Sequence, residues 1–249
     1  MHFGFDLAPD VFGILYDDSG KENNLSMAPV SGGIGPPKWD YGYGINGGGL
    51  LFSSDPNHTN YAQSSKMGWL SPRGSVSIWL KAGISGNKVG IPFCVSNGFA
   101  QGKTEFAIST DLMTKTVSIW LMIDGLTRWM ASTSPGTLAE SAWTQVVVTH
   151  DGSKPRIYVN GVGLPLEFSQ SNDLTAWMSS LGLASSPATK FYVGGAPRYY
   201  SPLMAVGFSG QVDELTVWDQ PLSGSTIYEL FSEMDSLSSQ SFSSASSGA

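Results

Sequence analysis

Apolar runs joined by very short turns dominate the middle of this sequence. Asp124-Gly125 separates the runs Thr116 to Ile123 and Leu126 to Ala131, and both turn residues tolerate a positive φ. A second pair of runs, Trp143 to Thr149 and Arg156 to Asn160, meets across a turn that also begins with Asp-Gly. This spacing favours antiparallel hairpins and argues against a bundle of long helices.

Further strand-like runs lie on both sides of these hairpins. They are Leu50 to Phe52, Ser75 to Lys81, Thr104 to Ser109, Lys190 to Gly194 and Gly210 to Trp218. Charged residues make up only 13% of the chain, against about 25% in an average globular protein. The chain has 249 residues, of which 30 are glycine. This composition favours an all-β domain of short strands.

Helix signals are few. The better one is Ser223 to Phe231, where a serine can cap the first turn, and the weaker one is Asp173 to Leu183. We expect each to be a short amphipathic helix that covers an edge of a sheet. From Ser236 the chain is serine-rich and uncharged, so we expect disorder when it is alone. The sequence thus predicts one domain, 1–235, and a tail, 236–249.

Charge and composition exclude several kinds of partner. The net charge is −7 and the 13 Lys and Arg residues are scattered, so nucleic-acid binding is disfavoured. The single cysteine, Cys94, excludes an intrachain disulfide. The first residues resemble no signal peptide, and no apolar run approaches the ~18 residues of a membrane span. We therefore expect no membrane insertion and no export through a cleaved signal.

The second hairpin carries a family resemblance. Trp143 to Gly152, followed by Arg156 to Gly161, resembles the laminin-G-like branch of the concanavalin A-like lectin/glucanase superfamily. Phe208 to Trp218 and the segment Pro221 to Phe231 resemble the end of the same family. The resemblance implies an all-β, two-sheet antiparallel jelly-roll sandwich with one or two short helices. It is specific for fold and not for function.

Catalytic patterns are missing from the sequence. Glucanases of this superfamily carry a Glu-x-Asp-x-x-Glu run, and no such run occurs here. The only close acid pair on a predicted strand is Asp213-Glu214, and adjacent strand residues should point to opposite faces. No Gly-x-Ser-x-Gly motif appears, and His2, His58 and His150 have no partner pattern. We read His150 as a structural turn residue and predict that the protein is not an enzyme.

The resemblance also implies a structural calcium ion. In this family such an ion often joins an acid of the N-terminal loop to an acid of the last strand, here Asp17 and Asp213. Two acids do not define the number of ligands that calcium needs. The alternatives are a turn role for Asp17 and a cap on neighbouring backbone groups for Asp213.

Aromatic residues in predicted loops are the candidate glycan ligands, because sugar rings stack on aromatic side chains. The candidates are Trp39, Tyr41, Tyr43, Arg198, Tyr199 and Tyr200. The alternative is that these side chains pack under loops or against a neighbouring subunit. The tryptophans in predicted strands are expected in the core: Trp79, Trp120, Trp143 and Trp218.

Three functions follow, in order of preference. The first is a non-enzymatic virion component, such as a phage or virus capsid decoration or fibre protein at the virion surface. It would form an oligomer with other virion or assembly proteins and bind surface glycans. We expect the N-terminal stretch to about Ser26, or the tail from Ser236, to pack against that partner. The second is a free lectin or adhesion module, exported by a non-classical route, and the third is a glycoside hydrolase with an atypical site.

Overall fold

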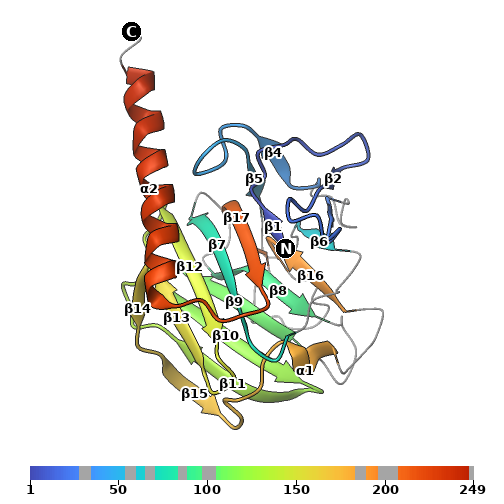
Figure 1. Ribbon diagram of the computed structural model, residues 1–249, viewed down its shortest axis with the longest axis vertical. Coiled ribbons are helices and arrows are strands. Elements are labelled where there is room, and N and C mark those ends of the chain that lie inside the picture. The colour runs from blue at the N-terminus through green and yellow to red at the C-terminus, as the bar shows by residue number, and fades with distance from the viewer. Residues whose placement is uncertain are drawn as a thin grey trace.

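The computed structural model describes residues 1–27, 35–53, 60–64, 71–83, 89–96, 105–182, 189–195 and 207–246. Two antiparallel sheets pack face to face, and one long helix lies against the outside of the first sheet (Figure 1). This is the two-sheet jelly-roll sandwich that the sequence predicts.

The first sheet has eight strands in the described part of the chain. Their order is β14 (Val162–Leu164), β13 (Pro155–Val159), β12 (Trp143–His150), β7 (Gly74–Ala82), β17 (Gly210–Trp218), β5 (Gly49–Phe52) and β4 (Lys38–Asp40), with β1 (His2–Phe3) also paired to β17. Strands β7 and β17 lie at its centre, so their outward side chains occupy the middle of the outer face.

The second sheet has nine strands among the described residues. Their order is β15 (Glu167–Ser171), β11 (Leu126–Ser132), β10 (Thr116–Ile123), β9 (Glu105–Asp111), β8 (Val89–Ser96), β16 (Lys190–Val193), β6 (Ala62–Ser64), β3 (Leu25–Ser26) and β2 (Ile14–Leu15). The core between the sheets is apolar and includes the stacked pair Trp129 and Trp177, with ring centroids 6.4 Å apart.

Two of the tight turns between strands adopt the left-handed backbone. Asp124 and Gly125 have φ values of 52° and 77°, and they join β10 to β11. Asn160 and Gly161 have φ values of 49° and 74°, and they join β13 to β14. Two successive residues with positive φ match the twist of adjacent strands, which is why Asp-Gly and Asn-Gly occur here.

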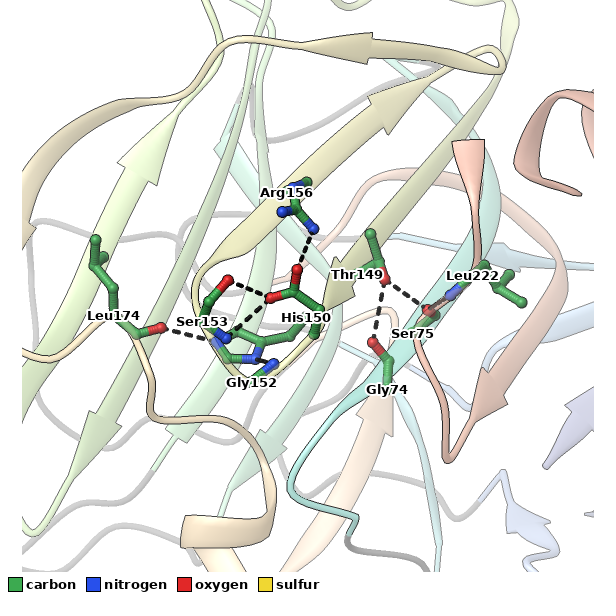
Figure 2. Close-up of polar contacts among 10 residues, drawn as sticks. Gly74, Ser75, Thr149, His150, Gly152, Ser153, Arg156, Leu174 and Leu222 are labelled. Carbon is green, nitrogen blue, oxygen red and sulfur yellow. Dashed lines mark hydrogen bonds and ion pairs between the residues drawn. The ribbon is translucent and has the colours of Figure 1, made fainter. Parts of the chain in front are cut away.

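The turn between β12 and β13 is built around His150 (Figure 2). Its Nδ1 accepts from Gly152 N at 3.0 Å, so its Nε2 carries the proton and donates to Leu174 O at 2.8 Å. The ring stacks on Trp177 with centroids 5.0 Å apart, and burial lowers the pKa of His150. His150 is therefore a neutral structural residue, as the sequence predicts.

A second set of bonds in Figure 2 fixes the chain that leads into the long helix. Ser75 Oγ accepts from Leu222 N at 2.8 Å and donates to Thr149 Oγ1 at 3.0 Å. The helix α2 (Gly224–Ser246) begins two residues later, and Ser223 Oγ caps it by accepting from Thr226 N. The first sheet thus holds the start of α2 in place.

The helices differ from the sequence predictions in length. The helix α1 (Ser179–Gly182) is four residues long, because Asp173 Oδ1 accepts from Thr175 N and holds a turn where a helix was expected. In contrast, α2 continues to Ser246, across the start of the expected tail. Elongating a helix that is already formed gains one bond per residue, which explains the extension.

The C-terminal part of α2 extends beyond the sheets (Figure 1). The described part of the chain contains no helix with both the length and the apolarity required to cross a membrane.

Candidate functional site

A groove of about 450 Å³ lies between the outer face of the first sheet and α2. Its floor is formed by Ser77, Gln145 and Thr216, from three neighbouring strands. Ser77 pairs with Thr216 across β7 and β17, and Trp79 pairs with Gln145 across β7 and β12. Directly opposed residues point to the same face of a sheet, so these four side chains form one surface.

The alternation of β7 explains why polar and aromatic side chains face the groove. Val76, Ile78 and Leu80 are fully buried between the sheets. The intervening Ser77 and Trp79 must therefore point outward.

One wall of the groove is α2. Phe231 stacks on Trp79 with ring centroids 5.7 Å apart and planes inclined by 15°, and Leu230 and Met234 line the groove beside it. A Cβ on Gly161 would come within 3.3 Å of Phe231, so the glycine permits close approach of the helix. The helix side of the groove is consequently apolar.

The opposite side of the groove is polar and carries an ion pair. His2 Nε2 lies 3.0 Å from Glu214 Oε2, and the two side chains are 41% and 18% exposed. The hydrogen bond with Glu214 raises the pKa of His2 more than burial lowers it. Ser19 lines the same end of the groove.

A β-bulge places Glu214 on this side. The register of β17 against β7 shifts between Asp213 and Thr216, and Glu214 has a φ of 48°. Val212 and Leu215 both point into the core, so Asp213 and Glu214 lie together on the outer side of the strand. The expectation that these two acids point to opposite faces is wrong, because the extra residue breaks the alternation.

Asp213 fixes the backbone of Glu214. Its side chain is fully buried, with Oδ1 accepting from Glu214 N at 2.8 Å and Oδ2 accepting from Ile45 N at 2.9 Å. Burial, followed by the charge of Glu214, raises the pKa of Asp213 well above its ordinary value. Asp213 thus positions the bulge.

Asp17 fixes the backbone of His2, the other member of the ion pair. Its Oδ1 accepts from His2 N at 2.9 Å and from Ser19 N at 3.0 Å, and its Oδ2 accepts from Asn23 Nδ2 at 2.9 Å. Burial raises the pKa of Asp17, but the hydrogen bonds from Ser19, His2 and Asn23 outweigh it and lower the pKa overall.

The two acids predicted to bind calcium therefore accept backbone N–H groups of residues that line the groove. Across the described ranges, no three His, Cys, Asp or Glu residues are grouped as a metal site requires. Calcium binding by Asp17 and Asp213 stays a prediction.

Of the predicted loop aromatics, Trp39, Tyr41 and Tyr43 do not line this groove. Trp39 is half-buried and donates its indole N–H to Phe5 O at 2.7 Å, while Tyr43 is half-buried and Tyr41 is 68% exposed. The structure brings these three together on β4 and the segment that follows it. The other three predicted ligands lie outside the described residues: Arg198, Tyr199 and Tyr200.

Sequence reasoning missed the tryptophans of the groove. Trp79 and Trp218 were expected in the core. Trp79 is buried, with 3% of its surface exposed, but it packs against Phe231 of α2 on the outer face and not between the sheets. Trp218 is half-buried and lines the groove on the same face. Trp120 lies on the outer face of the second sheet and donates to Glu105 Oε1 at 2.8 Å, while Trp143 is half-buried. The signal that could have located Trp79 is its position in β7: it alternates with the apolar residues Ile78 and Leu80 and therefore points to the opposite face.

Comparison with known structures reveals the same fold in carbohydrate-binding modules and toxin domains. The CBM40 of the Ruminococcus gnavus IT-sialidase, bound to α2,3-sialyllactose, is 18% identical with a TM-score of 0.58, covering 74% of this chain and 96% of that chain. Domain 4 of AbnA, a GH43 extracellular arabinanase from Geobacillus stearothermophilus, in complex with arabinotriose, is 17% identical with a TM-score of 0.53, covering 92% and 96%.

The receptor-binding domain of botulinum neurotoxin type G is 10% identical with a TM-score of 0.57, covering 93% of this chain and 50% of that chain. At these identities the likeness shows the fold alone. No curated protein matches the sequence. The profile of a family described as the concanavalin A-like lectin/glucanases superfamily matches residues 56–228, which is more than half of the chain. The chain therefore belongs to the concanavalin A-like lectin/glucanase superfamily.

Proposed function

We propose that this protein is a non-catalytic carbohydrate-binding module that holds its glycan in the groove beside α2. The observation that carries the proposal is the lining of the groove. Two tryptophans, Trp79 and Trp218, share it with the amide of Gln145 and the carboxylate of Glu214. Its volume of about 450 Å³ falls within the ~300–1,000 Å³ of ligand pockets.

This combination of side chains suits a sugar. The C–H faces of a sugar ring pack against indole rings, and its hydroxyl groups bond to carboxylates and amides. One face of Trp79 is covered by Phe231, whereas Trp218 is half-buried beside the groove. We therefore assign the main stacking role to Trp218.

Similar folds that hold sugars support the proposal. One is the CBM40 in complex with sialyllactose, and another is the arabinanase domain in complex with arabinotriose. The identities of 18% and 17% carry no information on which residues of this chain hold a glycan. That assignment rests on the groove.

The acids beside the groove favour binding over hydrolysis. Glycosidases require one acid that protonates the leaving oxygen and a second that acts as nucleophile or base. Asp213 is fully buried and both of its oxygens accept backbone N–H groups, so it does not reach a substrate. Glu214 is the one carboxylate among the described residues that line the groove, and a single acid does not supply both roles.

Binding to a glycan library, followed by calorimetry on each bound glycan, tests the proposal. We expect Trp218→Ala to weaken binding by about tenfold or more, because it removes the stacking surface. Trp143→Ala is the matched control, since Trp143 lies on the same sheet outside the groove. Absence of binding to every glycan, or equal losses in the two variants, would contradict the proposal.

A second proposal concerns the protein partner that the sequence analysis expects. It is favoured by exposed apolar side chains near the N-terminus. Leu7, Val11, Phe12 and Tyr16 are 76%, 94%, 83% and 58% exposed. Asp10 Oδ1 accepts from Phe12 N and Ile14 N, which fixes the turn that displays Val11 and Phe12. Exposed apolar side chains held by a rigid turn are typical of an interface.

We propose that this surface docks on an assembly protein whose apolar pocket is bordered by basic residues. The acids Asp6, Asp10 and Asp18 flank the surface and supply the charge complementarity. The virion assignment belongs to this second proposal. Light scattering on the native particle tests it: a mass far above 26.5 kDa supports an assembly, and a monomer contradicts it.

A further inference from the structure

Acidic groups gather around Glu214 at the polar end of the groove, although Asp6 and Asp18 do not themselves line it. A Cβ atom placed on Gly4 would have carboxylate oxygens of Asp6, Glu214 and Asp18 at 3.6, 3.6 and 3.8 Å. Burial raises the pKa of Asp6, and the charges of Glu214 and Asp18 add to that rise. Three carboxylates this close together give this end of the groove a negative potential.

The cations at the same end are already engaged. His2 is bonded to Glu214 at 3.0 Å. The amino group of Met1 donates to Val217 O at 3.2 Å, and burial lowers its pKa, which favours its uncharged form. No Lys or Arg is present among the described residues that line the groove. A carboxylate, sulfate or phosphate on a ligand would therefore meet Glu214 and its neighbouring carboxylates, with no Lys or Arg of the groove lining to pair with.

The floor of the groove presents a hydrogen-bond acceptor. Gln145 is 2% exposed, and its Oε1 has no hydrogen-bond partner among the described residues. The backbone of Gln145 is fixed, because its N–H donates to Asn160 Oδ1 and its carbonyl accepts from Asn160 N. The oxygen is already buried, and an unpaired buried acceptor is costly, so a ligand hydroxyl that reaches it supplies the partner that it lacks.

We infer that the groove selects an uncharged glycan and rejects acidic ones. This inference rests on the proposed function, because it assumes that a glycan occupies the groove. Hydroxyl groups of a neutral sugar donate to Gln145 and Glu214, which leaves the C–H face of the ring for Trp218. An acidic sugar loses this fit through repulsion by Glu214, Asp6 and Asp18.

Calorimetry with matched pairs of oligosaccharides tests the inference on the full chain. Each pair contains a neutral oligosaccharide and its acidic derivative, for example lactose and 3′-sialyllactose, and arabinotriose extends the neutral set. We expect the neutral member of each bound pair to bind at least about tenfold more tightly. We expect Glu214→Gln to narrow this preference, because the variant removes a charge and keeps the shape of the side chain.

A second variant tests the acceptor on the floor. Gln145→Leu should weaken neutral binding about tenfold or more, because a ligand hydroxyl loses its partner. The control is Gln170→Leu, on an exposed position of β15 in the other sheet. Acidic members that bind as tightly as neutral ones overturn the inference and leave glycan binding intact. If the protein binds none of the sugars, both the inference and the proposed function are overturned.

Discussion

At the scale of single residues, Glu214 shows how the site departs from regular structure. It has a φ of 48° inside a strand, a conformation that glycine adopts without cost and other residues avoid. The bulge that requires this conformation also aims the carboxylate at the groove. A strained residue at a binding site points to function rather than stability.

Two substitutions of Glu214 separate the strain of its backbone from its role in glycan binding. We expect Glu214→Gly to have a free energy of unfolding about 1 kcal/mol higher than Glu214→Ala, because both lose the bond to His2 and only glycine relieves the backbone. Both variants should lose glycan binding. Urea denaturation of the pair measures the difference, and an alanine variant as stable as the glycine variant would show that the conformation is not strained.

Asp17 links stability to pH. Its pKa is lowered in the folded protein, so its contribution to stability is complete above its unfolded pKa of about 3.9 and is lost as the pH falls below that value. We therefore expect Asp17→Asn to be less stable than the wild type at neutral pH. The gap should close as the pH falls below about 4. Thermal unfolding across this range measures the gap, and a gap that stays constant would contradict the role of the carboxylate.

At the scale of elements, α2 forms one wall of the site. Phe231 stacks on Trp79, and Ile227 is fully buried against the first sheet. We expect Phe231→Ala to lower the free energy of unfolding by about 1–3 kcal/mol, because it removes a partly buried ring and a stacked pair. It should also weaken glycan binding, since the wall of the groove loosens.

A shortened chain is the control for this prediction. Removing residues 238–249 leaves Phe231, Leu230 and Met234 in place, so stability and binding should be unchanged. Denaturant unfolding and calorimetry compare the two proteins. If the shortened chain loses as much stability and binding as Phe231→Ala, the distal half of α2 supports the groove, and not the turn that contains Phe231.

The elements also show what could be predicted from the sequence. Hairpins at Asp124-Gly125 and Asn160-Gly161 could be predicted, because turn chemistry and alternation are local. The bulge at Glu214 could not, since nothing in the neighbouring residues marks the extra position. The length of α2 was underestimated, because a polar composition does not reveal a helix that grows from a docked first turn.

At the scale of the whole molecule, the fold was easier to predict than the site. The order of the motifs predicts the sandwich, and the family profile over residues 56–228 agrees with it. The groove combines residues from the N-terminal, middle and C-terminal parts of the chain, from Met1 to Met234. Its position depends on which part of the outer face α2 covers, and no local pattern contains that information. In contrast, Trp39, Tyr41 and Tyr43 are close together in the sequence, so the sequence points to them more readily than to the residues of the groove.

The most direct test locates the glycan among the tryptophans. The chain has eight tryptophans, and each gives one indole N–H signal in a nitrogen–proton NMR spectrum. After titration with the tightest glycan from the library, we predict that the signals of Trp79 and Trp218 shift. Those of Trp129 and Trp177, which lie between the sheets, should stay in place. Shifts confined to Trp39 or Trp120, with Trp79 and Trp218 unmoved, would show that the glycan binds elsewhere and would contradict the assignment of the groove.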